Sequence, residues 1–368
     1  MNQVLDLTKS LNTGYVVRAR APLRLGLAGG GTDVSPYCDQ FGGAVLNATI
    51  NLHATATLYE NNENIVRFVA TDIEKSEEHQ CRDGYNVTQG LQLHRAVYSH
   101  FVKNYNNGIP IPLTVITNVD APPGSGLGSS SALVVAMVQA FDEYFSSRKT
   151  EYEIARIAHH IERNDARLNG GRQDQYAATF GGVNFMEFGN NESVLVNPLR
   201  VKPRILHELE ESIVTVFSGV SRDSAAIIDR QTDAIKTSSK SPLDAMHQLK
   251  AEAVNMKESL LRGDLREVAS IIHRSWEAKK RTSTAISNEL IEKIIKTGAR
   301  HGAVAAKVSG AGGGGFIMFI VEPSNKKTLA RALASAGYVV QPCQFTESGA
   351  KAWRTTPFAR THLLTQAV

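Results

Sequence analysis

Cysteine is scarce in this chain, with three residues among 368, and they lie far apart at Cys38, Cys81 and Cys343. An odd number of cysteines without any Cys-x-x-Cys pair indicates neither a disulfide framework nor a cysteine zinc site. The pattern instead predicts reduced thiols and a cytoplasmic protein.

Long hydrophobic runs and an excess of charge are also missing. The longest apolar runs, residues 132–138 and 316–321, are far too short to cross a bilayer, and the second has the length of a strand. The polar residues 1–14 do not look like a signal peptide, so we expect no membrane partner. The 40 basic and 36 acidic residues leave a net charge of +4, with no basic stripe that carries interleaved aromatic residues. We therefore expect no nucleic-acid partner.

The remaining composition is that of an enzyme-sized globular protein, 42% hydrophobic and 21% charged. The length suffices for two domains with their own cores, which we place at residues 1–200 and 201–368. Strand and helix patterns are mixed along the chain, and we find no internal repeat.

The chain is organised around residues 122–132, Pro-Pro-Gly-Ser-Gly-Leu-Gly-Ser-Ser-Ser-Ala, which lead into an apolar helix. A glycine-rich turn that opens a helix aims free N–H groups and the positive end of the helix dipole at one point, where phosphate is the natural occupant. The serine hydroxyls there can cap the helix, hold phosphate or hold a metal. The stretch has neither the Gly-Lys-Ser/Thr of the P-loop nor the spacing of a dinucleotide site. A capped core helix after a tight turn is the alternative.

A second glycine-rich segment, residues 21–33, is an apolar strand that ends in three glycines and Thr32-Asp33. Such a turn lets a ligand approach the backbone and presents Asp33 beside it, although Asp33 is also typical of a simple turn or helix N-cap. Arg24 lies within the apolar strand, so its charge must be paired or must face a site.

A third segment, residues 309–315, has five glycines in seven residues between strands predicted at 303–308 and 316–321. A hairpin needs far fewer glycines, and the apolar flanks argue against a flexible linker. We expect a glycine wall that packs against a ligand or against residues 122–132.

Two carboxylates lie between these segments. Glu162 belongs to a helix predicted over residues 151–168, and Asp174 follows two helix-breaking glycines. Taken alone, Glu162 is typical of a solvated helix face, and Asp174 of the N-cap of a helix over residues 175–180.

Other expectations concern elements with no chemistry of their own. We expect a strand over residues 15–20, which Pro22 terminates. We also expect an irregular connection over residues 72–84 and a crossing between domains over residues 195–204. We expect His94 and His100 to be ordinary helix-face residues. Further predicted elements are strands at 44–59, 65–70, 113–119, 183–188, 213–217 and 338–341, and helices at 90–103, 224–236, 243–261, 265–280, 288–301 and 326–336.

Together and in this order, the three glycine-rich segments resemble the motifs of the GHMP kinase superfamily, the galacto-, homoserine, mevalonate and phosphomevalonate kinases. The second motif departs from the family pattern at one position, Ser131, where alanine is usual. The first motif lacks the Gly-Glu-His-Thr-Asp of galactokinases. With the Gln-Asp-Gln-Tyr at residues 173–176, it is similar to kinases of D-glycero-D-manno-heptose 7-phosphate, with L-fucose kinases as near relatives.

This resemblance implies an α+β, two-domain GHMP kinase fold, with an N-terminal domain like ribosomal protein S5 domain 2 and a ferredoxin-like C-terminal domain. It also implies a set of site residues. The catalytic residues would be Asp174, as the base, and Arg24, as the neighbouring cation. Magnesium would be held by Ser130 and Glu162. The substrate-binding residues would be Gly30, Gly31, Thr32, Asp33, Arg172 and Gly312. The ATP-binding residues would be Pro123, Gly124, Ser125, Gly126, Leu127, Gly128, Ser129, Ser130 and Ser131.

The implied reaction is phosphorylation of the anomeric C1 hydroxyl of the heptose phosphate, with ATP as co-substrate, Mg²⁺ as cofactor and a small-molecule sugar phosphate as the partner. It would serve nucleotide-activated heptose and surface polysaccharide. The sugar's own phosphate needs a cation, for which Arg172, Arg222, Lys279 and Lys280 are candidates. The alternatives are an L-fucose kinase or another sugar kinase of the family, a non-catalytic sugar sensor, and the family's decarboxylase branch. The chain would be a monomer or a homodimer.

Overall fold

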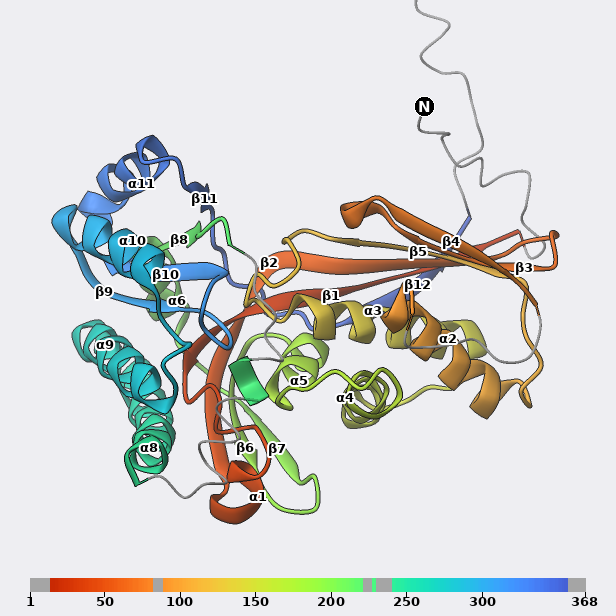
Figure 1. The fold of residues 1–368 in the computed structure, drawn as a ribbon, viewed down its shortest axis with the longest axis horizontal. Coiled ribbons are helices and arrows are strands. Elements are labelled where there is room, and N and C mark those ends of the chain that lie inside the picture. The colour runs from red at the N-terminus through yellow and green to blue at the C-terminus, as the bar shows by residue number, and fades with distance from the viewer. Residues whose placement is uncertain (1–13, 82–88, 221–226, 230–239, 357–368) are drawn as a thin grey trace, which may run out of the picture.

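The computed structural model describes residues 14–81, 89–220, 227–229 and 240–356. These residues form two units that lie end to end, each with its own sheet (Figure 1). No helix within these ranges has the length and apolarity that a bilayer crossing demands.

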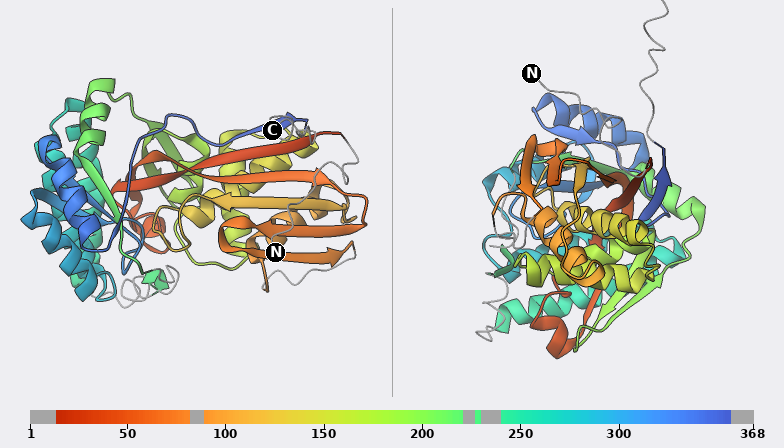
Figure 2. Two further views of the ribbon diagram at one scale, coloured as in Figure 1. Left: turned by 90° about the horizontal axis from the view of Figure 1, so that it is seen from above. Right: turned by 90° about the vertical axis from the view of Figure 1, so that its right-hand side faces the viewer.

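The first unit is built on an eight-stranded sheet with the order β12-β1-β2-β5-β3-β4, in which β6 also pairs with β2, and β7 with β6. Its strands lie side by side along the length of the molecule (Figure 2). Their bounds are β1 Val16–Ala28, β2 Gly43–Glu60, β3 Ile65–Ala70, β4 Lys75–Gln80, β5 Leu113–Val119, β6 Val183–Phe188, β7 Val194–Pro198 and β12 Lys351–Thr355.

Helices of the first unit cover one face of this sheet (Figure 1). They are α2 Gln92–Tyr105, α3 Ser129–Phe145, α4 Glu151–His160 and α5 Gln173–Phe180, and a short helix, α1 Tyr37–Phe41, joins β1 to β2. The helix α3 packs against both β1 and β2, and its apolar residues 134–138 are fully buried. The helix that follows the central glycine-rich turn is therefore held rigidly by the core.

The second unit is a four-stranded antiparallel sheet, order β11-β8-β10-β9, with α9, α10 and α11 packed on it, whereas α8 packs on α9 and on β1 and β2 of the first unit. The strand and helix sequence, with this order, is that of the expected ferredoxin-like unit. The bounds are α6 Pro203–Ser212, β8 Ile213–Phe217, α8 Lys240–Arg262, α9 Leu265–Thr282, α10 Glu289–Arg300, β9 Ala303–Val308, β10 Phe316–Val321, α11 Lys326–Ser335 and β11 Val339–Gln341.

Several expectations from the sequence were wrong. The strand β1 does not end at Pro22 but continues to Ala28, with a shift of register beside Pro22, where a residue without an N–H is tolerated. The strand β4 lies within the segment 72–84 that we expected to be irregular, and β7 overlaps the start of the expected domain crossing at 195–204. The residues of β4 are all polar, so this strand lacks an apolar pattern, whereas β7 is a short edge strand that pairs only with β6 among the described strands.

The strand β12 was not expected at all. It pairs with β1 in antiparallel register, so the chain returns to the first unit after completing the second. The division at residues 200 and 201 stays a prediction. The predicted helix over residues 224–236, the lead-in at 1–13 and the tail at 360–368 lie almost wholly outside the described residues.

Candidate active site

The three glycine-rich segments meet at one place between the two units. The Phe316 N–H donates to the Ser125 carbonyl at 2.8 Å, and the Ser309 hydroxyl donates to the Gly126 carbonyl at 2.9 Å. The Arg24 N–H donates to the Leu127 carbonyl at 3.0 Å. A Cβ at Gly126 would lie 2.3 Å from the Ser309 carbonyl oxygen, so the contact requires glycine. The expectation that residues 309–315 pack against residues 122–132 is confirmed.

The central turn leads directly into the first residue of α3. Gly124, Gly126 and Gly128 have φ angles of +70°, +76° and +75°, which favour glycine. Gly128 is the N-cap and supplies no side-chain hydrogen bond to the helix. The alternative of a side-chain-capped core helix therefore does not hold, and the N–H groups at this helix start are available to a phosphate.

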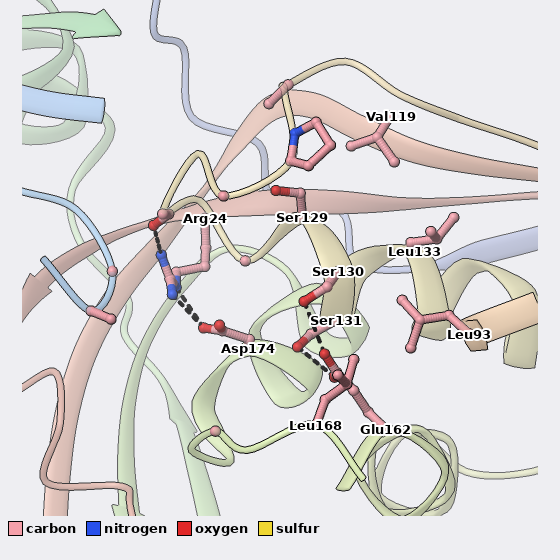
Figure 3. A pocket seen from close by; sticks show the side chains of 18 of the residues that line it. Arg24, Leu93, Val119, Ser129, Ser130, Ser131, Leu133, Glu162, Leu168 and Asp174 are labelled. Carbon is pink, nitrogen blue, oxygen red and sulfur yellow. Dashed lines mark hydrogen bonds and ion pairs between the residues drawn. The ribbon is translucent and has the colours of Figure 1, made fainter. Parts of the chain in front are cut away.

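A cavity of about 540 Å³ lies against this turn. One side is apolar, with Val119, Leu133 and Leu93 on its walls, and Leu168 lies beside Glu162 (Figure 3). The other side is polar and is lined by the central turn, its serines and the two carboxylates. A nucleoside triphosphate has the same distribution of polarity, because a flat and largely apolar nucleobase lies at one end and a chain of charged phosphates at the other.

His94 lies on the apolar side and was expected on an ordinary helix face, yet it is only 3% exposed. Its Nε2 is 2.8 Å from the Thr117 hydroxyl. Burial lowers the pKa of His94 to about 4, so the ring is neutral at pH 7.

Asp174 and Arg24 form an ion pair on the polar side of the cavity (Figure 3). The Arg24 Nε and Nη2 donate to Asp174 Oδ1 at 2.7 and 2.6 Å, and Nη1 donates to the Gly126 carbonyl at 2.6 Å. Asp174 lies in the first turn of α5, whose N-cap is Arg172, so the N-cap alternative does not hold. Because its side chain is 23% exposed, Asp174 is accessible from the cavity.

Glu162 is 1% exposed, so the alternative of a solvated carboxylate was wrong. The single helix predicted over 151–168 ends as α4 at His160 and continues as a π-helical turn, Ile161–Asp165. This turn directs Glu162 towards the start of α3. Its Oε1 accepts a hydrogen bond from Ser130 at 2.9 Å, and its Oε2 accepts from Ser131 at 2.7 Å (Figure 3).

Gln175 completes this arrangement, because its Nε2 donates to Glu162 Oε2 at 2.6 Å and lies 3.1 Å from the Ser131 hydroxyl. Two donors thus hold Oε2, whereas Oε1 accepts from Ser130 and lies 3.3 Å from Arg163 Nη1. Within the described ranges no cluster of three or more acidic, histidine or cysteine side chains occurs. One carboxylate oxygen and one hydroxyl nevertheless fit Mg²⁺, which takes most of its ligands from phosphates and water.

The predicted sugar-binding residues occupy several positions. Asp33 is 1% exposed and accepts hydrogen bonds from the Gly31 N–H and from the backbone and side chain of Gln173, at 2.9 to 3.1 Å. The Thr32 hydroxyl donates to two backbone carbonyls. Gly30 adjoins Gln173 and Lys279, since a Cβ there would lie 3.8 Å from each side-chain nitrogen.

Arg172 and Gly312 have other contact partners than this group. The Arg172 guanidinium donates to Asp39, Ser35 and the Gly189 carbonyl. Gly312 packs on Ile286, where a Cβ would lie 3.0 Å from the carbonyl oxygen. Sequence reasoning missed the positioning role of Gln173 and Gln175, although both flank Asp174 directly.

Comparison with known proteins agrees with this geometry. The family model described as the GHMP kinases N terminal domain matches residues 92–182, and the GHMP kinases C terminal model matches residues 256–339. The D-glycero-alpha-D-manno-heptose 7-phosphate kinase of Campylobacter jejuni is 43% identical over 92% of this chain and 99% of its own. The L-fucokinase/L-fucose-1-P guanylyltransferase of Bacteroides fragilis is 25% identical, and the match covers 83% of this chain but 35% of that protein.

Among solved structures, a D-glycero-D-manno-heptose 1-phosphate kinase from Bacteroides thetaiotaomicron superposes with a TM-score of 0.78 and 41% identity. The match covers 92% of this chain and 98% of that one. With both family models in order and identity above 40% over nearly the whole length, the chain belongs to the GHMP kinase family, as a phosphotransferase with an alcohol acceptor.

Proposed function

We propose that the protein transfers the γ-phosphoryl group of ATP to the C1 hydroxyl of D-glycero-D-manno-heptose 7-phosphate and so forms the 1,7-bisphosphate. The observation that carries this proposal is the 43% identity to a heptose 7-phosphate kinase across 92% of the chain. The cavity that joins a phosphate-binding turn to the Asp174 carboxylate supports it. A role in nucleotide-activated heptose and surface polysaccharide follows if this substrate is right.

Asp174 is the proposed base. Its carboxylate takes the proton from the C1 hydroxyl while the sugar oxygen attacks the γ-phosphorus and ADP leaves. The anomeric hydroxyl is more acidic than an ordinary alcohol, so a carboxylate is a competent acceptor. Arg24 fixes the carboxylate through Oδ1 at 2.6 to 2.7 Å, and Oδ2 remains for the substrate.

The central turn is the proposed cradle for the ATP phosphates, from Pro123 to Ser131. Its left-handed glycines bring the backbone N–H groups to the ligand, and the start of α3 adds a favourable dipole. Ser130 and Glu162 are the proposed ligands of Mg²⁺, which when bound neutralises phosphate charge. The apolar side of the cavity is proposed to take the base.

Asp33, Gly30, Gly31, Thr32, Arg172 and Gly312 are proposed to shape the sugar site. In this structure Asp33 accepts two hydrogen bonds on Oδ1 and one on Oδ2, so about one of its four acceptor sites, on Oδ2, is left to accept a sugar hydroxyl. The proposed location is the cytoplasm, since ATP is the co-substrate and Cys38, Cys81 and Cys343 are all free thiols.

ADP release over a panel of sugars tests the function. The panel contains D-glycero-D-manno-heptose 7-phosphate, unphosphorylated heptose, L-fucose, mannose 6-phosphate and mevalonate. We expect the highest kcat/KM with the heptose phosphate, and a new anomeric phosphate signal by ³¹P NMR. Preference for L-fucose would favour the fucokinase alternative, and no sugar-dependent ADP release with any compound would leave a non-catalytic sensor.

A further inference from the structure

Two buried lysines adjoin the proposed active site, and neither has a role in the mechanism above. Lys279, in the last turn of α9, is 5% exposed, and Lys307, in β9, is 6% exposed. The Lys279 Nζ donates to the Gly310 carbonyl at 2.6 Å and lies 3.5 Å from the Gly30 carbonyl oxygen. The Lys307 Nζ donates to the Leu27 carbonyl at 3.2 Å. In the part of the chain that the structure describes, neither lysine forms an ion pair with a carboxylate.

The charges that face these lysines do not balance. Arg24, Lys279 and, when it is protonated, Lys307 supply up to three positive charges, and Asp33 and Asp174 supply two carboxylates. Asp174 is already paired with Arg24, and Asp33 is already bonded to backbone and amide N–H groups. A buried cation without a counterion destabilises the folded state, so this position suits a bound anion.

The titration of the two lysines agrees with this charge excess. Burial lowers the pKa of Lys279 to about 8, with Arg24 lowering it further and Asp33 and Asp174 opposing the shift. Burial, with the charges of Lys279 and Arg24, lowers the pKa of Lys307 to about 7. An arriving anion would favour the charged form of both.

The other cations considered for the sugar's phosphate have different partners. Arg172 is bound to Asp39 at 3.1 Å. Lys280 pairs with Glu277 at 2.7 Å and lies 5.8 Å from the centre of the Trp276 ring. Arg222 lies outside the described residues. Among the candidates that the structure describes, only Lys279 lies against Gly30 and interacts electrostatically with Asp33.

We propose that Lys279, assisted by the charge of Lys307, binds a phosphoryl anion where the first and third glycine-rich segments meet, and that this anion is the phosphate of the sugar substrate. The inference rests on the proposed function for the identity of the sugar. The γ-phosphate of ATP is the other source of the same chemistry. In either case the anion would contact Lys279 of the second unit beside Gly30 of the first unit. A bound anion would therefore strengthen the contact between the two units.

Lys279→Gln tests the proposal, because glutamine keeps a donor for the Gly310 carbonyl and removes the charge. Arg281→Gln is the matched control, since it removes a positive charge from an exposed position on the same turn of α9. KM and kcat are measured with heptose 7-phosphate, with unphosphorylated heptose and with varied ATP. Losing a charged hydrogen bond to phosphate should raise KM for the phosphorylated sugar by about 10- to 100-fold. KM for the unphosphorylated sugar should change little.

The arms separate the two sources of phosphate. A rise in KM confined to the phosphorylated sugar assigns the site to the sugar's phosphate. If KM rises equally with both sugars, and the variant loses more affinity for ATP than for ADP, the site binds the γ-phosphate. That result would overturn the sugar-phosphate assignment. If Lys279→Gln behaves as Arg281→Gln does in every arm, the phosphoryl site itself is refuted.

Two measurements keep the proposal testable if the variant does not fold or the sugar is another one. In the wild type, KM for heptose 7-phosphate should rise about tenfold per pH unit above the Lys279 pKa of about 8, while KM for unphosphorylated heptose stays flat. Inorganic phosphate at millimolar concentration should raise Tm of the wild type more than that of Lys279→Gln. Turnover of neither heptose by the wild type rejects the proposed function, and the phosphate-dependent Tm then decides the lysine site separately.

Discussion

Gly128→Ala should disable the reaction by moving Asp174 without touching its chemistry. Gly128 has a φ of +75°, and a Cβ there would lie 3.2 Å from Asp174 Cγ and 3.5 Å from Oδ1. The left-handed backbone costs alanine about 1 to 2 kcal/mol. The added methyl group must also push the carboxylate away by a few tenths of an ångström or more. A displacement of this kind costs up to about 100-fold in turnover, because the base must stay aligned with the attacking oxygen.

Gly337→Ala separates the two effects. Gly337 has a φ of +89° with nothing within 4 Å of the added Cβ, so that variant carries the backbone strain alone. Both variants should lose about 1 to 2 kcal/mol of stability, measured by urea unfolding. Only Gly128→Ala should lose kcat in the ADP-release assay. If folded Gly128→Ala keeps the wild-type kcat, Asp174 is not held where the chemistry requires it, and the argument for the base fails.

The remaining predictions concern the carboxylates and the lysines. Asp174→Asn should lower kcat by about 100-fold or more with little change in ATP affinity by calorimetry, and an unchanged kcat would remove it from the mechanism. Glu162→Gln should raise the Mg²⁺ concentration needed for binding of a non-hydrolysable ATP analogue, and Ser131→Ala should do so less strongly; unchanged midpoints would argue against a metal site. Because the pKa of Lys279 is lowered from 10.5 to about 8, the unfolded chain binds more protons between these values, so the free energy of unfolding should rise with pH across that window. Lys279→Met should flatten this rise, and an unchanged slope would assign it to other groups.

The sequence predicted the elements that carry strong apolar patterns. The strands β5, β6 and β8 have the predicted bounds, because each is a short segment rich in β-branched and aromatic residues. The meeting of the glycine-rich segments was also predictable. Five glycines in seven residues have no use in a hairpin, and they are explained by backbones that approach each other closely, as Gly315 does Ser125.

The weaker elements were not predictable for a physical reason. The residues of β4 and β12 are mostly exposed, so their pairing depends on the neighbouring strand and not on their own composition. The burial of Glu162 depends on a π-helical turn, which leaves no signal in the spacing of apolar residues. Lys279 was one of several candidate cations in the sequence, and only the fold shows that its ammonium group turns inward.

Ser131 shows how a departure from the family pattern gains a physical meaning. Alanine at this position would leave Glu162 Oε2 with Gln175 as its side-chain donor, whereas the serine hydroxyl adds a second bond at 2.7 Å. Because Glu162 is buried, the extra donor holds its carboxylate in one orientation. Oε1 accepts a hydrogen bond from Ser130 and lies 3.3 Å from Arg163 Nη1, and it is the oxygen that the proposed Mg²⁺ would meet. Serine at this position therefore fixes the orientation of the Glu162 carboxylate, which the methyl group of alanine would not do. With alanine at position 131, the same carboxylate would have more rotational freedom.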